Sequence, residues 1–371
     1  MSKMLSKYSK LDVNVSLMRI IACFIVIGCH VRLSPIVDNH IDNSLLFIHG
    51  FFDDGVAIFF CVTGFFLFNN IIYKNLWKKI LKNIIFPTIL IEGVSCLLHG
   101  FLAGGSLIES LCNPGINLAT YLHDILSFKF NSEVYAAHLW YITSYISIIV
   151  AFPVLKLIVN EYEKGIKYPL NWVLALGIFN LFAKDLQAVF LFPVGEIETY
   201  TVFSVPILLC LLGYVLYKYK QMFYGRKYLG IITLIAMVGI NIIRYFLQKN
   251  LFDKNINNDY FFYWNTLVAL IFSVSFIIFF LSIECKKKHI IVNYIASQTF
   301  AIYLLHVLVF YTLDRFGIRN LLLNNLGKGI VKESIYSIVY PLLIFVISLC
   351  LVSLFNIIKY IVIDKAKSIK L

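Results

Sequence analysis

Long apolar runs separated by short polar loops dominate the chain. Ten segments approach the roughly 20 consecutive apolar residues that a helix needs to cross a bilayer. They cover about residues 15–35, 52–73, 83–103, 137–158, 169–184, 200–217, 228–246, 261–283, 292–313 and 335–361. The fifth segment is short and is followed by the polar Lys184 and Asp185. The pattern predicts an all-α, polytopic membrane protein with about ten transmembrane helices.

Composition and charge agree with this interpretation. Hydrophobic residues make up 60% of the 371 residues, and the mean hydropathy is +0.83, whereas soluble domains are about 45–50% apolar. The loops and chain ends on one side of the predicted helices carry 21 of the 32 Lys and Arg residues, and those on the other side carry 10. Short cationic loops stay in the cytoplasm, so we expect both termini there. The net charge of +12 then follows from the topology and requires no nucleic acid.

The chain is expected to form one membrane domain over residues 1–371, without a soluble domain. Its N-terminal sequence, MSKMLSKYSKLD, is polar and no small-residue cleavage site follows the first apolar run. We therefore expect the first helix to act as its own insertion signal. The eight cysteines form no CxxC or Cys/His pattern, so neither a disulfide framework nor a metal site is expected.

The first apolar run, LMRIIACFIVIGCHVRL, carries Arg19 near one end and His30 near the other. Eleven helical residues separate them by about 16 Å along the axis and about 20° around it. The two side chains therefore share a face, with Arg19 at the cytoplasmic interface and His30 in the outer half of the membrane. A snorkelling arginine and a histidine hydrogen-bonded between helices remain alternatives. Because ionisable groups inside a span are costly, a functional role is the leading hypothesis.

Other polar side chains lie within the predicted spans or at their ends. Glu92 lies near the middle of the third span and is the only carboxylate expected deep inside one. His138 and His306 reach the outer half from the fourth and ninth spans, while Asp53 and Asp54 lie at the outer start of the second. A satisfied or protonated carboxyl group, packing histidines and solvated boundary charges are the structural alternatives. The shared depth of the histidines favours function.

Five motifs occur in a particular order along the chain. They are Arg-x10-His in the first span, then GVAIFFCVTGFFLF (55–68), HLWYI (138–142), GYVL (213–216) and FAIYLLHVL (300–308). Together they resemble the acyltransferase 3 family, integral-membrane enzymes that O-acylate glycans and other exported molecules. The resemblance covers nearly the whole chain.

Two positions depart from the family pattern. Ala57 stands where the family often has an acid, as in the branch that acts on surface polysaccharides. The loop after the second span reads KKILK, with Lys79 and Lys82 where the family often has an arginine-rich K/R-x-x-R element. Lysine is a point charge without the bidentate fork of arginine, so the phosphate-binding geometry differs from the family pattern while its sign is kept.

The resemblance implies transfer of an acyl group, most often acetyl, from cytoplasmic acyl-CoA to a hydroxyl group. His30 is the expected general base, because a neutral imidazole titrates in the range needed to accept the hydroxyl proton. Cationic groups at the inner face would hold the phosphates of acetyl-CoA. These groups are Arg19, Lys78, Lys79 and Lys82.

Supporting roles are expected for the remaining candidates. Glu92 would fix the tautomer of the base, and His138 and His306 would bind acceptor hydroxyls or the developing oxyanion. Asp53 and Asp54 are placed near the acceptor by the resemblance. Trp140 and Tyr303 are candidates for stacking on a sugar ring.

The expected acceptor is a glycan or lipid-linked saccharide, such as capsule or O-antigen, at the cell surface. The expected location is the cytoplasmic membrane of a bacterium, among its lipids, because the chain is rich in Ile, Asn, Lys and Phe. Two alternatives remain open: a polysaccharide exporter and a non-catalytic membrane domain on the same scaffold. Neither requires a cytoplasmic CoA site.

Overall fold

A computed structural model describes most of the chain. The described residues are 12–37, 40–68, 73–108, 118–130, 134–190, 204–254, 259–285, 289–326 and 330–368. Residues 1–11 and 369–371 lie outside this set, so the location of the two termini stays a prediction.

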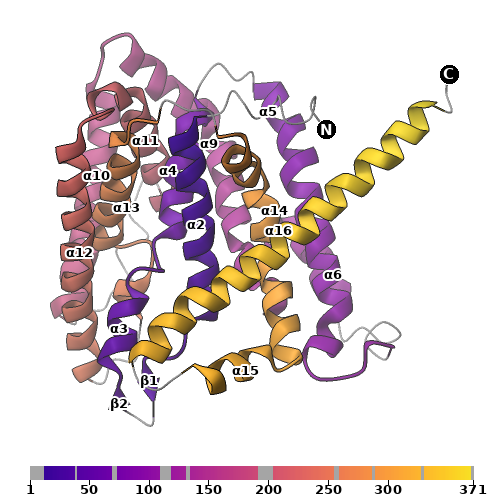
Figure 1. The fold of residues 1–371 in the computed structure, drawn as a ribbon. Helices are drawn as coiled ribbons and strands as arrows, with labels where there is room; N and C mark the ends of the chain where they lie inside the picture. The colour runs from indigo at the N-terminus through magenta and orange to yellow at the C-terminus, as the bar shows by residue number, and fades with distance from the viewer. Residues whose placement is uncertain are drawn as a thin grey trace.

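The fold is a bundle of helices (Figure 1). The α-helices are α2 (Val13–Val31), α3 (Asn43–His49), α4 (Gly55–Leu67), α5 (Tyr73–Ile80), α6 (Phe86–Leu102), α8 (Leu118–Ser127), α9 (Trp140–Glu163), α10 (Tyr168–Phe190), α11 (Val205–Lys218), α12 (Lys227–Asp253), α13 (Leu267–Ser282), α14 (Ile290–Arg315), α15 (Ile318–Asn325) and α16 (Ile330–Ser368). A π-helical stretch, η2 (Leu81–Ile85), joins α5 to α6, and the 3-10 turns are η3 (Val134–Leu139), η5 (Lys220–Met222) and η6 (Tyr260–Phe262). The short strands β1 (Ile36–Val37) and β2 (His40–Ile41) pair antiparallel after α2.

The prediction of a polytopic all-α membrane protein is confirmed. In the described part of the chain, eight helices are long and apolar enough to cross a membrane. Two predicted segments, the second and the sixth, correspond to the shorter apolar helices Gly55–Leu67 and Val205–Lys218. Each of the ten predicted segments therefore overlaps a helix, while the number of complete crossings stays a prediction.

Several helices extend beyond the predicted spans. The helical stretch Asn75–Leu102 begins well before the predicted third span, so Lys78, Lys79 and Lys82 are helical rather than in a loop. Helix α10 continues through Lys184 and Asp185, which are both buried, although the prediction placed them after the span. A span predicted from hydropathy ends at the first charged residues. The helix itself continues when those charged side chains have partners or reach the membrane interface.

Helix α4 packs closely against α11, and its sequence explains why. Gly64 lies so near to α11 that an added Cβ would stand 1.8 Å from the Cys210 carbonyl oxygen. A Cβ on Gly213 would stand 2.0 Å from the carbonyl oxygen of Cys61. The Gly residues of two motifs thus let the backbones of two helices approach, as small residues do in membrane bundles.

The described ends of the chain lie on one side of the bundle (Figure 1). The start of α2, helix α5 and the far end of the long oblique α16 lie at the top of the view, whereas α3, the β-hairpin and α15 lie at the bottom. The lysine distribution predicts that the top is cytoplasmic. The bottom is then the outer side.

Candidate active site

Helices α2 and α14 bring together the residues of two motifs. The Arg19 guanidinium on α2 donates to Thr299 Oγ1 on α14 at 3.2 Å. Further out, the ring of His30 lies 5.2 Å from that of His306, measured between centroids. The two helices therefore run in the same direction, and Arg19 and His30 lie on the side of α2 that faces α14.

Three histidines from three elements form one cluster. His138, in the η3 turn before α9, lies 4.9 Å from His306 and 6.2 Å from His30 between ring centroids. His138 and His306 are only 3% and 0% exposed. The histidines that were predicted to share a depth are thus brought into mutual contact. No group of three or more His, Cys, Asp or Glu side chains suited to a metal ion occurs among the described residues.

Hydrogen bonding distinguishes the rings of His138 and His306, the two buried histidines of this cluster. His306 Nδ1 lies 2.6 Å from the Tyr303 carbonyl oxygen, which only accepts, so Nδ1 carries the proton and Nε2 of the neutral ring keeps its lone pair. Within the described residues, His306 Nε2 and both ring nitrogens of His138 have no hydrogen-bond partner. Among the described residues, His306 Nε2 is thus a buried acceptor without a donor, beside the ring of His30.

An outer cavity of about 280 Å³ adjoins the histidine cluster. Its lining comprises His30, Ala137, His138, Trp140, Val307, Phe310 and Tyr311. His30 is exposed to this cavity although it lies within the bundle. One face of Trp140 stacks on Trp264 with ring centroids 5.3 Å apart, which fixes the orientation of the indole that borders the cavity.

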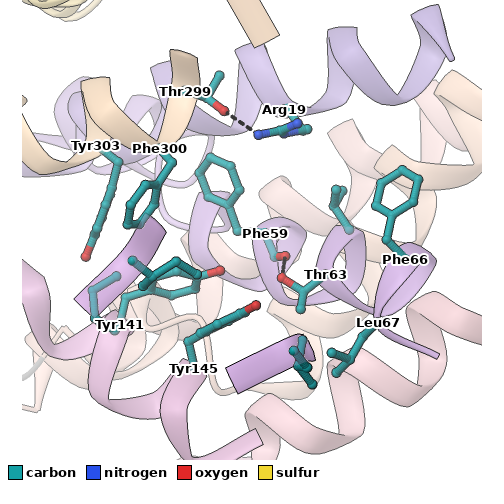
Figure 2. A pocket seen from close by; sticks show the side chains of 14 residues that line it. Arg19, Phe59, Thr63, Phe66, Leu67, Tyr141, Tyr145, Thr299, Phe300 and Tyr303 are labelled. Atoms are coloured by element: carbon teal, nitrogen blue, oxygen red, sulfur yellow. Dashed lines mark hydrogen bonds between the residues drawn. The ribbon is translucent and has the colours of Figure 1, made fainter. Parts of the chain in front are cut away.

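An inner cavity of about 320 Å³ lies around Arg19 (Figure 2). Figure 2 shows Tyr303 and Phe300 on one side of the cavity and Phe66 and Leu67 on the other. Arg19 is half-buried and makes no ion pair with a carboxylate in the part of the chain that the structure describes. A guanidinium without a counter-charge, in a mainly apolar cavity, favours binding of an anion.

The three predicted phosphate-binding lysines do not line this cavity. Lys78, Lys79 and Lys82 are exposed on α5 and η2, whereas the same segment contributes Leu76 and Ile84 to the lining. The sequence alternates so that the apolar residues pack inward and the ammonium groups face outward. The structure therefore brings Arg19 to the cavity and leaves the lysines on the surface of this segment.

Asp53 and Asp54 are buried, which contradicts the alternative that they are solvated boundary charges. Asp53 accepts from Arg32 at 2.7 Å, and Arg32 also pairs with Asp259 at 3.0 Å. Both oxygens of Asp54 accept from Arg244 Nη2 at 2.8 Å. Burial raises the pKa of Asp53 to about 7 and that of Asp54 to about 6, while the guanidinium groups oppose the shift.

Arg244 is one of the ten Lys and Arg residues that the sequence assigns to the outer side, but it does not lie in a loop. It belongs to α12 and is 0% exposed. The signal available in the sequence was its place inside the apolar run of residues 228–246. Its carboxylate partner could not be chosen without the fold, because Asp54 lies 190 positions away.

Glu92 is buried on α6, as its position in the third span predicted. Burial and then the Glu92 carboxylate raise the pKa of Tyr121, which lies on α8 and donates to the Ile89 carbonyl at 3.1 Å. Another buried carboxylate follows the predicted fifth span, near the C-terminal end of α10. Asp185 is buried in α10, where Tyr260 Oη and the Leu267 amide donate to it at 3.0 Å.

Tyr303 occupies a different place from the one expected of a sugar-stacking side chain. It is 5% exposed and lines the inner cavity, and its hydroxyl donates to the His138 carbonyl oxygen. Sequence reasoning missed Thr299 and Tyr145, which line the same cavity. Thr299 lies one helical turn before Tyr303, so the i, i+4 spacing was the available signal.

The fold and the site together define a multi-pass helical membrane protein with a cationic inner cavity and a histidine-lined outer cavity. The chain matches the family model described as "Acyltransferase domain" over residues 12–358. It therefore belongs to the acyltransferase 3 family and is a membrane acyltransferase. No curated protein and no solved structure matches the chain.

Proposed function

We propose that the protein is an O-acyltransferase that moves an acetyl group from cytoplasmic acyl-CoA to a hydroxyl of an extracytoplasmic or lipid-linked glycan. One observation carries the proposal. The α2–α14 pair holds the Arg19 guanidinium at an inner cavity and His30 at an outer cavity. The same two helices thus connect a place for an anionic donor with a place for a base.

The donor is assigned to the inner cavity. Its lining is largely apolar and aromatic, which suits a pantetheine arm and an acyl group, and Arg19 supplies the charge for a phosphate. The exposed lysines of α5 and η2 then act at longer range, by raising the local concentration of an anionic donor. About 16 Å of helix between Arg19 and His30 separates the charged part of the donor from the reacting carbonyl.

His30 acts as the general base in this proposal. The acceptor hydroxyl loses its proton to the imidazole while its oxygen attacks the thioester carbonyl carbon, forming a C–O bond. The tetrahedral intermediate collapses with breakage of the C–S bond, and the imidazolium returns the proton to the departing CoA thiolate. The products are the ester and free CoA thiol, and the histidine is regenerated.

His138 and His306 serve the acceptor side. Because the His306 Nδ1 proton is directed to the Tyr303 carbonyl, its neutral Nε2 accepts a hydrogen bond and suits an acceptor hydroxyl better than an oxyanion. His138 lines the outer cavity, where a protonated ring nitrogen donates to the oxyanion. Trp140 borders the same cavity and offers a surface for a sugar ring. Glu92, Asp53 and Asp54 stay predicted as supporting groups.

Turnover of acetyl-CoA tests the proposal. Purified protein in detergent is given acetyl-CoA with and without saccharide prepared from a capsule or O-antigen, and release of CoA thiol and the mass gain of the saccharide are measured. His30→Ala should reduce acceptor-dependent thiol release by about 10²–10⁴-fold. His123→Ala is the matched control, because its ring is 66% exposed on α8, and it should behave as wild type.

The rival functions give different results. A polysaccharide exporter or a non-catalytic membrane domain would consume no thioester with any acceptor. Wild-type turnover in the His30→Ala protein would remove His30 from the role of base. Thiol release without a mass gain on the saccharide would contradict the glycan acceptor while leaving the donor assignment intact.

A further inference from the structure

The direction of the Arg19 side chain decides whether it can bind a ligand. A long arginine side chain near the inner end of a membrane helix can snorkel to the interface, where its guanidinium meets water. In the structure Arg19 instead lines the inner cavity. Figure 2 shows its bond to Thr299 at one border of this cavity, opposite Tyr141 and Tyr145. The position of the guanidinium therefore depends on the partner that holds it there.

Hydrogen bonding fixes the Thr299 hydroxyl as an acceptor toward Arg19. This hydroxyl donates to the Ala296 carbonyl oxygen of its own helix at 2.9 Å. A threonine hydroxyl has one proton and two lone pairs, so its proton is engaged and its lone pairs remain. Arg19 Nη2 donates to the same oxygen at 3.2 Å. A guanidinium only donates, and Thr299 supplies the acceptor that it needs.

A second bond keeps Thr299 at the level of Arg19. Cys23 lies one turn after Arg19 on α2, and its Sγ donates to the Thr299 carbonyl oxygen at 3.6 Å. Residues four apart share a helix face. The same face of α2 therefore contacts both the side chain and the backbone of Thr299, which aligns the two helices at this level.

The polar neighbours of Thr299 on α14 point in other directions. Ser297 Oγ donates to a carbonyl oxygen of its own helix at 2.6 Å. Gln298 Oε1 accepts from Asn356 on α16 at 2.9 Å. Successive helical residues point about 100° apart, so of these three it is Thr299 whose bond crosses to α2 in the described part of the chain.

Burial indicates that Thr299 acts through Arg19. Thr299 borders the inner cavity but is 0% exposed, whereas Arg19 is half-buried. A ligand in the cavity therefore meets the guanidinium and not the threonine hydroxyl. The guanidinium has five N–H donors in one plane, so its bond to Thr299 leaves others for an anionic group.

We infer that Thr299 is a positioning residue, which holds the Arg19 guanidinium in the inner cavity for the phosphates of the acyl-CoA donor. This inference rests on the proposed binding of acyl-CoA beside Arg19. A free arginine side chain loses rotamer freedom when it binds a ligand. The bond to Thr299 restricts that freedom before the donor arrives, so less entropy is lost on binding.

Calorimetric titration of the full-length protein in detergent tests the inference. One probe is S-acetonyl-CoA, a thioether that cannot transfer an acyl group, and the other is S-acetonylpantetheine, which lacks the phosphates. Thr299→Val keeps the shape of the side chain and removes the hydroxyl. It should weaken binding of S-acetonyl-CoA by about threefold to tenfold, the range expected for one hydrogen bond. Its affinity for S-acetonylpantetheine should equal that of wild type.

Three further variants show that the hydroxyl is responsible. Thr299→Ser restores it and should bind S-acetonyl-CoA as wild type does. Thr299→Ala removes it from a smaller side chain, and it replaces the valine variant if that protein does not fold. Thr312→Val is the matched control on α14, because the Thr312 hydroxyl donates to the Leu308 carbonyl oxygen at 2.7 Å and Thr312 lines neither cavity. It should bind both probes as wild type does.

Combination with Arg19→Ala separates positioning from direct contact. If Thr299 acts through Arg19, Thr299→Val causes no further loss of S-acetonyl-CoA binding in the Arg19→Ala protein. An equal loss with and without Arg19 overturns the inference, because Thr299 would then contact the donor by itself. Unchanged binding in Thr299→Val, an equal loss for both probes, or a serine variant as weak as the valine variant also overturns it.

Failure of the proposed function has a different signature. Wild type that binds no S-acetonyl-CoA, or an Arg19→Ala protein that binds it as tightly as wild type, contradicts the donor site itself. Failure of the inference alone leaves the dependence on Arg19 intact. The two failures are therefore distinguishable.

Discussion

The buried ion pair between Arg244 and Asp54 allows a quantitative test of how the outer end of the bundle is held together. Both side chains are 0% exposed. The guanidinium contacts both oxygens of the carboxylate at 2.8 Å and also donates to the Gly50 carbonyl. Replacing Arg244 with Met keeps an unbranched apolar side chain beside Phe272, whose ring centroid lies 5.6 Å from Arg244 Cζ, and removes only the charge and the donors.

The expected loss of stability follows from the two buried groups that lose their partner, the Asp54 carboxylate and the Gly50 carbonyl. The substitution leaves a buried carboxylate without its counter-charge, and removing one partner of such a pair costs about 3–5 kcal/mol. The Gly50 carbonyl also loses a donor, which accounts for about 1–3 kcal/mol when the acceptor stays buried. Because the two effects share one site they are not additive, so we expect a total of about 3–6 kcal/mol at pH 8.

The loss of stability caused by Arg244→Met should depend on pH, because Asp54 carries no uncompensated charge once it binds a proton. Burial raises its pKa to about 6 in the folded protein against an ordinary 3.8, although Arg244 lowers it. Without Arg244 the folded pKa rises further. The folded state then holds a proton that the unfolded state has lost, so stability falls as the pH rises from about 4 through the folded pKa. Arg244→Met should therefore be less destabilised at pH 5 than at pH 8.

Thermal unfolding of purified protein in one detergent, followed by intrinsic fluorescence at pH 5 and pH 8, measures both effects. Asp54→Asn in the Arg244→Met background removes the uncompensated charge, so it should recover at least half of the lost Tm at pH 8 and abolish the added pH dependence. The reasoning is refuted if Arg244→Met is as stable as wild type at pH 8. It is also refuted if the double variant with Asp54→Asn is no more stable than Arg244→Met alone.

Two other predictions concern the donor cavity and the helix packing. Arg19→Ala should weaken binding of acyl-CoA analogues about tenfold or more, because it removes a charge-assisted contact; an unchanged affinity in calorimetry would remove Arg19 from the donor site. Gly64→Ala should lower Tm by the equivalent of about 1–3 kcal/mol, because the new Cβ meets the Cys210 carbonyl oxygen at 1.8 Å. The matched control is Gly239→Ala in α12, where nothing lies within 4 Å; this change should leave Tm equal or higher, and equal behaviour of the two variants would contradict the close packing.

The spans were predictable because a bilayer imposes a local requirement on the chain. About 20 apolar residues must follow one another, and this pattern is visible without knowing any contact. The helical phase of Arg19 and His30 was predictable for the same reason, since 11 residues along one helix determine their relative direction. Their common orientation toward α14 follows from that phase once the neighbouring helix is known.

The predicted ends of the spans were less accurate. A span predicted from hydropathy ends at the first charged residue, so the predicted fifth span ended at Lys184. In the structure, Lys184 and Asp185 are buried within α10. The predicted third span likewise began after Lys82, whereas the helix starts earlier and exposes its lysines. Whether a charge ends a helix depends on its partners, and those come from other helices.

By itself, the sequence determined the all-helical membrane architecture, the family motifs and the common level of His30, His138 and His306, because these depend on residues close together along the chain. Only the tertiary structure decided which polar groups meet. Arg19 and Thr299 are 280 positions apart, and Arg244 and Asp54 are 190 apart. The arrangement of the helices selects such partners, and it also places Tyr303 at the inner cavity beside the ring of His138. The physical reason is that periodicity fixes the direction and depth of a side chain, whereas packing fixes what lies opposite to it.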